Sequence, residues 1–179
     1  MKAVTKARAK KTRVDASDMT LVDKLLGIDR VTKVVKGGRH LRFRASVVVG
    51  DGEGNVGFGS AKAAAVPEAV RKAGAVARKE MIKVPVRDGT IPHEIVAKFG
   101  ASRILLKPAA PGTGLIVNST SRALLELAGI KDILGKSLGG SSKINVAKAT
   151  MLALANLRQS EEPIQMNAEA QEEKTDETE

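Results

Sequence analysis

The sequence predicts an α+β protein in two halves, because each half places strand-like segments before a helical pattern. In the first half, two alternating segments meet at Gly37-Gly38, and a glycine-rich turn at 50–55 leads into a third strand. The second half has strand-like segments and then two helical patterns. A stretch rich in turn residues separates the halves, at Pro85, Asp88-Gly89 and Pro92. We therefore expect one domain over residues 21–84 and another over 85–159.

The most basic part of the first half is the segment from Arg30 to Arg44, which holds six Lys and Arg residues and His40. A diglycine between alternating segments indicates a hairpin, because glycine reaches the positive φ that tight primed turns need. The second segment alternates cleanly, with Leu41, Phe43, Ala45, Val47 and Val49 on one face and His40, Arg42 and Arg44 on the other. We expect the first face to enter a core and the second to offer cations to a phosphate backbone.

Two helices are expected around this hairpin. A short one over Leu21–Leu26 has Ser17 or Asp18 near its start and Gly27 where a left-handed cap would end it. After the third strand, at residues 56–59, a longer helix is expected from Pro67 to about Lys83. Its apolar stripe is Val70, Ala73, Ala77 and Met81, and its basic residues are Arg71, Lys72, Arg78 and Lys79.

The second half is expected to hold four strands and two helices. The strands are predicted over Glu94–Phe99, Arg103–Lys107, Leu115–Val117 and Ile130–Leu134. The first helix is predicted over Arg122–Ala128, with a cap from Ser119 or Thr120 and an end at Gly129, and the second over Asn145–Arg158.

Charge is divided unevenly along the chain. Residues 1–159 carry 29 Lys and Arg against 12 Asp and Glu, a net charge of +17, whereas residues 160–179 carry 1 against 8, a net charge of −7. We expect a disordered basic arm over residues 1–20, either a solvated terminus or an RNA contact, and a disordered acidic tail over 160–179. A basic body favours nucleic acid, since neutralised phosphates release their counterions.

Composition excludes several classes of protein. The chain has no cysteine, which rules out disulfide scaffolds, zinc knuckles and thiol catalysis. Its longest apolar runs fall far short of the roughly 18–20 residues of a membrane span. Phe43, Phe58 and Phe99 are the only aromatic residues, too few for a platform that stacks single-stranded bases. The expected target is therefore structured RNA or duplex, held by its backbone.

Two motifs resemble nucleotide sites, and neither is complete. Gly52-x-Gly54-x-x-Gly57 matches a dinucleotide fingerprint, but the sequence continues as a strand where the fingerprint needs a helix. Leu134-Gly-Lys-Ser137 matches the end of a P-loop but lacks its first glycine. His40 and His93 lack the spacing of a metal site, and His93 is expected to be structural. No catalytic residue, cofactor or metal is predicted, although an enzyme with a nucleotide at Gly52 to Gly59 remains a competing class.

Several longer segments resemble the bacterial family of the fifth protein of the small ribosomal subunit. They run in family order over about residues 20 to 158, as Arg30-Val-Thr-Lys-Val-Val-Lys-Gly-Gly-Arg39, Val48-Val-Gly-Asp-Gly-Glu-Gly-Asn-Val-Gly-Phe-Gly59, Ala61-Lys-Ala63 with Val66-Pro67, Lys98-Phe-Gly-Ala-Ser-Arg103, Lys107-Pro-Ala-Ala-Pro-Gly-Thr-Gly114 and Ala128-Gly-Ile-Lys-Asp-Ile-Leu134. The chain departs from the family pattern at Ser60-Ala61, at Asn118-Ser119-Thr120 and at Ser142-Lys143, where Asn-Pro is usual.

This resemblance implies a first domain like the double-stranded-RNA-binding domain, with a three-stranded antiparallel sheet, and a second α+β domain with a sheet covered by two helices. It implies that the hairpin loop enters small-subunit rRNA near the neck, close to the spectinomycin site. The resemblance covers the loop from Val31 to Arg39, and the cationic face of the hairpin extends the expected contact. The predicted rRNA-binding residues are Arg30, Thr32, Lys33, Lys36, Gly37, Gly38, Arg39, His40, Arg42, Arg44 and Lys62. The implied contact with the fourth subunit protein is at Gly112, Gly114 and Arg122.

The resemblance also implies partners and a role. The eighth subunit protein would be a further neighbour, and the family lines the channel by which mRNA enters and influences decoding accuracy. We therefore expect a cytoplasmic, non-enzymatic constituent of the small ribosomal subunit, with no membrane partner and no small-molecule substrate. The alternative is a free-standing chaperone of structured RNA, which would use the same chemistry.

Overall fold

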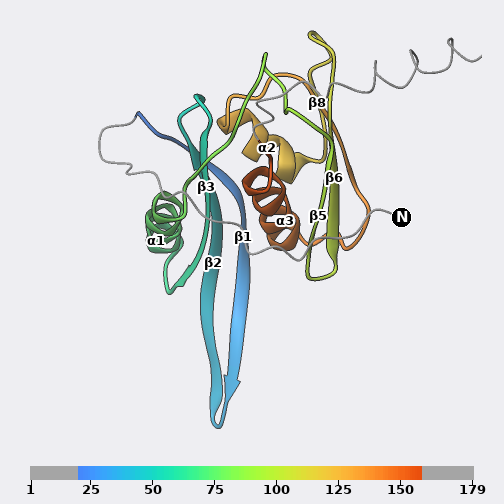
Figure 1. Cartoon of the computed structure of the whole chain (residues 1–179). Coiled ribbons are helices and arrows are strands. Elements are labelled where there is room, and N and C mark those ends of the chain that lie inside the picture. Colours follow the sequence, from blue (N-terminus) through green and yellow to red (C-terminus); the bar gives the residue numbers. More distant parts are fainter. Residues whose placement is uncertain (1–19, 159–179) are drawn as a thin grey trace, which may run out of the picture.

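The computed structural model describes residues 20–158 (Figure 1). The predicted basic arm, apart from its last residue, and the predicted acidic tail lie outside the described residues. The first half contains β1 (Val22–Val35), β2 (Gly38–Gly50), β3 (Asn55–Ala63), α1 (Val66–Lys79) and β4 (Ile82–Lys83). The second half contains β5 (Ile95–Phe99), β6 (Ser102–Pro108), β7 (Leu115–Ile116), α2 (Ser119–Leu127), β8 (Ile133–Ser137) and α3 (Lys143–Ala155).

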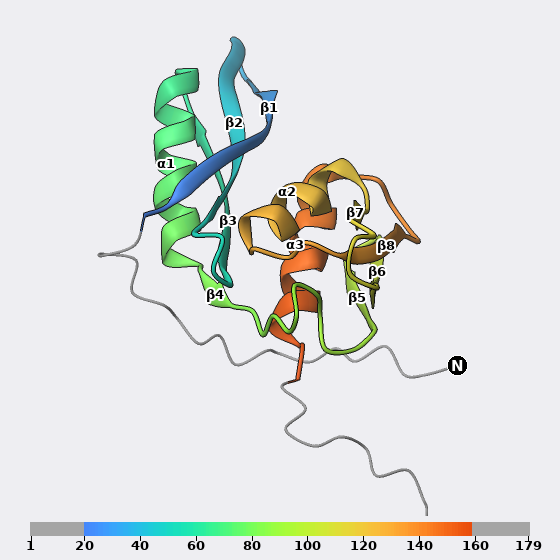
Figure 2. The ribbon, with the colours of Figure 1, turned by 90° about the horizontal axis from the view of Figure 1, so that it is seen from above.

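The first sheet is antiparallel, in the order β1-β2-β3-β4, with α1 against one face (Figures 1 and 2). Its fourth strand has two residues and extends the predicted three-stranded sheet. The helix predicted over Leu21–Leu26 is wrong, because these residues belong to β1 from Val22 onward and pair with β2, Val22 with Gly50 and Leu25 with Val47. Pairing across the sheet overrides the local capping pattern there. A bulge at Leu26 shifts the register before Gly27 pairs with Ser46.

Helix α1 packs closely on β3 because β3 presents glycines to it. A Cβ atom at Gly57 would lie 2.2 Å from the carbonyl oxygen of Ala77, and one at Gly59 would lie 2.1 Å from that of Ala73. The helix ends at Lys79, before the predicted Lys83, because Ile82 and Lys83 form the short strand β4. Its buried residues are Ala69, Ala73, Gly74 and Ala77.

The second sheet has the order β5-β6-β8-β7, and only the β7–β8 pair is parallel. Helices α2 and α3 lie between the two sheets (Figures 1 and 2). The N-cap of α2 is Asn118, in place of the predicted Ser119 or Thr120, and its side chain accepts a hydrogen bond of 3.0 Å from the backbone N–H of Ser121. Strand β8 begins at Ile133, three residues after the predicted start, because Gly129 and Ile130 still close the end of α2.

One hydrophobic core joins the two halves. It includes Val48, Val56 and Phe58 from the first sheet together with Leu124 of α2 and Leu154 of α3. A second, smaller cluster lies under α1 and contains Ala45, Val47 and Val49. The second half of β2 is therefore buried on both faces, which fixes the position of the first sheet against α2 and α3. The α+β class is confirmed.

Candidate nucleic-acid interface

Strands β1 and β2 continue well beyond the core as a hairpin (Figure 1). Its turn is Lys36-Gly37, since Val35 pairs with Gly38. Gly37 has a φ of 91°, whereas neither Lys36 nor Gly38 has a positive φ. The predicted primed turn at Gly37-Gly38 is therefore wrong in detail, because a primed turn needs positive φ at its first central residue. Gly37 forms part of the turn, and Gly38 forms the last β1–β2 pair, with Val35.

The hairpin presents cations on both faces. Cross-strand pairing places Lys33 opposite His40, and Arg42 and Arg44 follow on the same face, which continues into Ser46 and Val48 toward the second domain. We call this the domain-side face. Arg30 pairs with Phe43 and Arg39 with Val34 on the opposite face, which continues under α1 and which we call the helix-side face. Alternation along β2 predicts the cations at His40, Arg42 and Arg44. Arg30 and Arg39 are also among the predicted rRNA contacts, but the sequence pattern does not place them on the opposite face.

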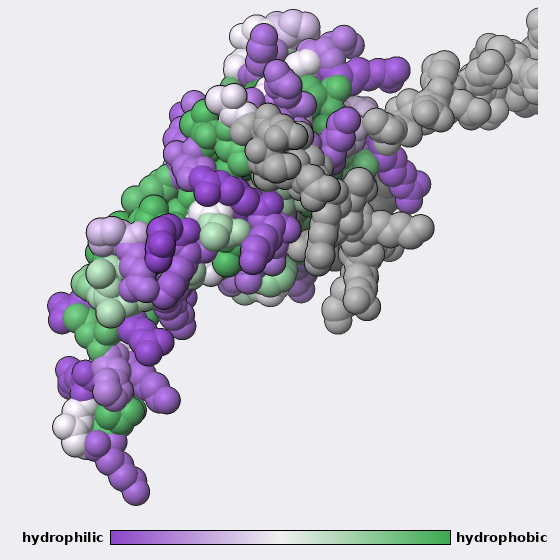
Figure 3. Space-filling view, turned by 90° about the vertical axis from the view of Figure 1, so that its left-hand side faces the viewer, coloured by the Kyte–Doolittle hydropathy of each residue, from purple (hydrophilic) through white to green (hydrophobic). Residues whose placement is uncertain are grey.

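The apolar row of β2 is only partly buried. Ala45, Val47 and Val49 are in the core, as predicted, but Leu41 is 38% exposed, because the hairpin has left the body of the protein there. Val34 is 74% exposed beside it on the helix-side face. Hydrophobic and hydrophilic side chains are consequently mixed along the projecting finger (Figure 3). Such a surface can contact sugars and base edges as well as phosphates.

At the root of the hairpin, the Arg44 guanidinium bonds one carboxylate oxygen of Asp29, from Nη2 at 2.8 Å and from Nε at 3.2 Å. Lys62 of β3 pairs with Arg44 in the sheet and is exposed. The hairpin cations that form no ion pair with a carboxylate of residues 20–158 are Arg30, Lys33, Lys36, Arg39 and Arg42. Every predicted cation of the site except Arg44 is thus available to an outside anion.

The second predicted surface lies in the second domain, in the loop before β7. Gly112 and Gly114 have φ of 87° and 76°, and the Gly114 N–H donates to the carboxylate of Asp132 at 2.8 Å. Arg122 of α2 donates from Nη2 to the Leu115 carbonyl at 3.0 Å. The structure therefore brings the predicted partner-contact residues together around β7.

The motifs that resembled nucleotide sites have structural roles. Gly57 lies within β3 and allows the close approach of α1, so no helix opens at the glycines to receive a pyrophosphate. Leu134 to Ser137 form part of β8. His40 is exposed on the hairpin and His93 is half-buried before β5. Within the described part of the chain, no three His, Asp or Glu side chains gather as metal ligands would.

Two further charged features emerge from the structure. The basic face of α1 is partly neutralised, by Glu68 at 2.6 Å from Lys72 and by Asp23 at 3.0 Å from Arg78. The outer face of the second sheet carries cations that sequence analysis did not single out, Lys98, Arg103, Lys107 and Lys136. Their period-two spacing with buried Ala97, Ile104 and Leu106 was the available signal.

A two-domain α+β body with a long cationic finger is the architecture of a protein suited to a large polyanion. None of the helices in residues 20–158 is long and apolar enough to cross a membrane. The family model for the ribosomal protein S5 N-terminal domain matches residues 21–85, and the family model for the S5 C-terminal domain matches residues 97–169. The second match extends past residue 158, where the motif resemblance ended.

Two proteins named small ribosomal subunit protein uS5, from two strains of Dehalococcoides mccartyi, are similar to this chain. One is 54% and the other 53% identical over 150 residues, covering 84% of this chain and 87% of each relative. The chain belongs to the ribosomal protein S5 family. It is a structural, non-enzymatic constituent of the small ribosomal subunit, and it acts in the cytoplasm as part of the ribosome.

Proposed function

We propose that the β1–β2 hairpin anchors the protein to small-subunit rRNA by binding its phosphate backbone. The observation that supports this most directly is that the hairpin extends past the core with cations on both faces, most of them without a carboxylate partner among the described residues. The contact residues we propose are Arg30, Thr32, Lys33, Lys36, Gly37, Gly38, Arg39, His40, Arg42, Arg44 and Lys62. The space around Gly37 and Gly38 is open, since a Cβ added to either glycine would meet no heavy atom within 4 Å, and RNA can therefore approach the backbone there.

The test is to replace Lys36 and Arg39 together by Gln in the full chain and to measure rRNA binding as a function of salt. Each lost phosphate contact should lower the salt slope by about one, so the double variant should lose about two and bind more weakly at every salt concentration. The matched control replaces Lys83 and Lys131, two exposed cations outside the hairpin, and should leave the slope nearly unchanged. An equal effect of both double variants would mean that only net charge matters and would overturn the proposal.

In the assembled subunit, we propose that the protein lines the channel by which mRNA enters and supports accurate decoding. The surface around Gly112, Gly114 and Arg122 would contact the fourth subunit protein, and the eighth would be a further neighbour. The support is that these residues lie together on an exposed part of the second domain, away from the hairpin. We propose domain limits at residues 21–84 and 85–159, between an arm over 1–20 and a tail over 160–179.

Two experiments test this wider role. Replacing Arg122 by Ala should weaken binding to the purified fourth protein while leaving rRNA affinity unchanged, and the reverse pattern would reject this surface. Cosedimentation with small subunits through a high-salt gradient separates a stable subunit constituent from a free-standing RNA chaperone, which would dissociate and remain at the top.

A further inference from the structure

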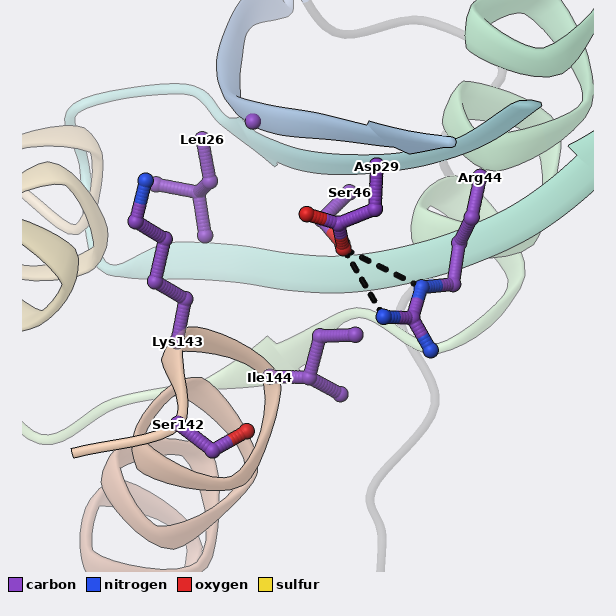
Figure 4. A pocket seen from close by; sticks show the side chains of 8 residues that line it. Leu26, Asp29, Arg44, Ser46, Ser142, Lys143 and Ile144 are labelled. Atoms are coloured by element: carbon purple, nitrogen blue, oxygen red, sulfur yellow. Dashed lines mark hydrogen bonds and ion pairs between the residues drawn. The ribbon is translucent and has the colours of Figure 1, made fainter. Parts of the chain in front are cut away.

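A cavity of about 290 Å³ lies between the root of the hairpin and the start of α3 (Figure 4). The β-bulge at Leu26 forms one wall, and the first turn of α3 at Lys143 and Ile144 forms the other. The domain-side face of β2 contributes Arg44 and Ser46. We call this cavity the notch. Its walls come from segments of the two domains that lie about a hundred residues apart in sequence, so the notch exists only where the two domains pack together.

The α3 wall of the notch is positively charged without compensation. The Ser142 side chain does not cap the helix, and the first turn contains no acidic residue. Lys143 adds a cation where the helix dipole is already positive, an arrangement that costs stability unless an anion is near. Its Nζ extends toward the bulge and would lie 3.8 Å from a Cβ at Gly27. No carboxylate within the described residues forms an ion pair with it.

The hairpin wall holds hydrogen-bond donors without acceptors. Ser46 is only 4% exposed, lines the notch, and has no side-chain hydrogen bond to any residue of the described part of the chain. The residue is buried, but its hydroxyl oxygen is still open to solvent at the notch, where a ligand can reach it. Arg44 bonds Asp29 through Nε and Nη2, which leaves Nη1 without an acceptor among the described residues. Asp29 is the carboxylate that lines the notch, and Arg44 already occupies one of its oxygens.

We propose that the notch binds one phosphate group of the RNA backbone, in addition to the contacts of the hairpin. A hydroxyl, a guanidinium nitrogen, an ammonium group and a helix N-terminus together suit an oxyanion. The volume is at the lower limit of pockets that enclose whole small molecules, and it suits one group projecting from a larger ligand. The notch also continues the domain-side face, so a strand bound along Lys33, His40 and Arg42 reaches it at the root. The inference rests on the proposed rRNA-binding function.

The first arm of the test uses inorganic phosphate and the free full-length chain. In ¹H–¹⁵N NMR spectra, phosphate should cause saturable shifts of the Ser46, Lys143, Ile144 and Asn145 amides, beyond those caused by chloride at equal ionic strength. Lys143→Gln and Ser46→Ala should each weaken this binding several-fold, whereas Lys131→Gln should not. Because the Ser46 hydroxyl has no partner, Ser46→Ala should not lower the melting temperature. Absence of saturable shifts, or a lower melting temperature with unchanged phosphate binding, would overturn the site.

The second arm uses small-subunit rRNA and asks whether the phosphate is that of the backbone. Lys143→Gln should lower the salt slope by about one, as a hairpin variant does. If phosphate binds but the slope is unchanged, the notch serves free phosphate and the RNA assignment is overturned. If Lys36→Gln with Arg39→Gln lowers the slope and Lys143→Gln does not, the hairpin function stands and the notch inference fails. If neither changes the slope, both fail.

Discussion

Asp29 and Arg44 face each other across β1 and β2 at the root of the hairpin, with 2.8 Å between the Arg44 Nη2 and the Asp29 carboxylate. This ion pair lies where the hairpin leaves the core, between buried Ala45 and exposed Arg42. It removes one positive charge from the domain-side face at the point where the notch begins. Both side chains are partly exposed, so the pair contributes little to stability.

Replacing Asp29 by Asn should therefore separate binding from stability. We expect the free energy of unfolding to fall by no more than about 1 kcal/mol, because exposed ion pairs contribute about 0–1 kcal/mol. Affinity for rRNA should rise, and its salt dependence should steepen, since Arg44 becomes available and a repulsive carboxylate is lost. Filter binding at several salt concentrations measures both. A decrease in affinity would show instead that Asp29 holds Arg44 in its binding position.

The close packing of α1 on β3 predicts that adding a side chain at Gly59 lowers stability. Gly59→Ala would place a Cβ 2.1 Å from the backbone oxygen of Ala73, so the helix must move away from the sheet. Such overpacking costs typically about 1–3 kcal/mol, which urea denaturation can measure. Gly38→Ala is the matched control, because no heavy atom lies within 4 Å of its Cβ and its φ is not positive. Similar losses in the two variants would argue against helix–strand contact as the cause.

The turn after β2 makes stability depend on pH. Burial raises the pKa of the Asp51 carboxyl, but hydrogen bonds from the Asn55 side chain and from the Glu53 and Asn55 backbone N–H groups outweigh it, and the pKa lies below its ordinary value of 3.8. The unfolded chain then binds this proton more readily than the native state does. The resulting stabilisation is complete above pH 3.8 and is lost as pH falls through the native pKa.

This prediction is checked by comparing the chain with its Asp51→Asn variant. The difference between their free energies of unfolding should be constant near neutral pH and should shrink as pH falls below about 4. The comparison cancels the other carboxylates, which titrate in both proteins. A difference that does not vary with pH would mean that Asp51 supports the turn through shape alone.

The acidic segment over residues 160–179, which lies outside the described residues, makes a prediction from charge. Its net charge of −7 opposes the +17 of the rest of the chain, and we expect it to discourage non-specific pairing with RNA before assembly. Deleting it should strengthen binding to an unrelated duplex RNA at low salt more than binding to rRNA. A gel-shift comparison of the two ligands measures this, and unchanged binding to the unrelated duplex would reject the role.

Local patterns in the sequence determined most of the elements of this protein. Alternation predicted β2, and 3.6-residue periodicity predicted α1 and α3 within a few residues of their observed ends, because these patterns reflect burial on one face. The glycines that marked the hairpin also placed its tip to within one residue. The cationic row at His40, Arg42 and Arg44 followed from the same alternation.

Tertiary structure decided what local patterns could not express. Leu21 to Leu26 carry helical signals, yet β1 forms there because its backbone pairs with the far end of β2, as Val22 does with Gly50. The same packing buries β2 on both faces, joins Asp29 to Arg44, and brings Lys143 within reach of the Leu26 bulge. The sequence by itself therefore determined the cationic row of β2 and the core face of its second half, but not that Leu41 lies outside the core. Only the fold decided which of those cations are neutralised and which converge, because pairing and packing join residues across long separations.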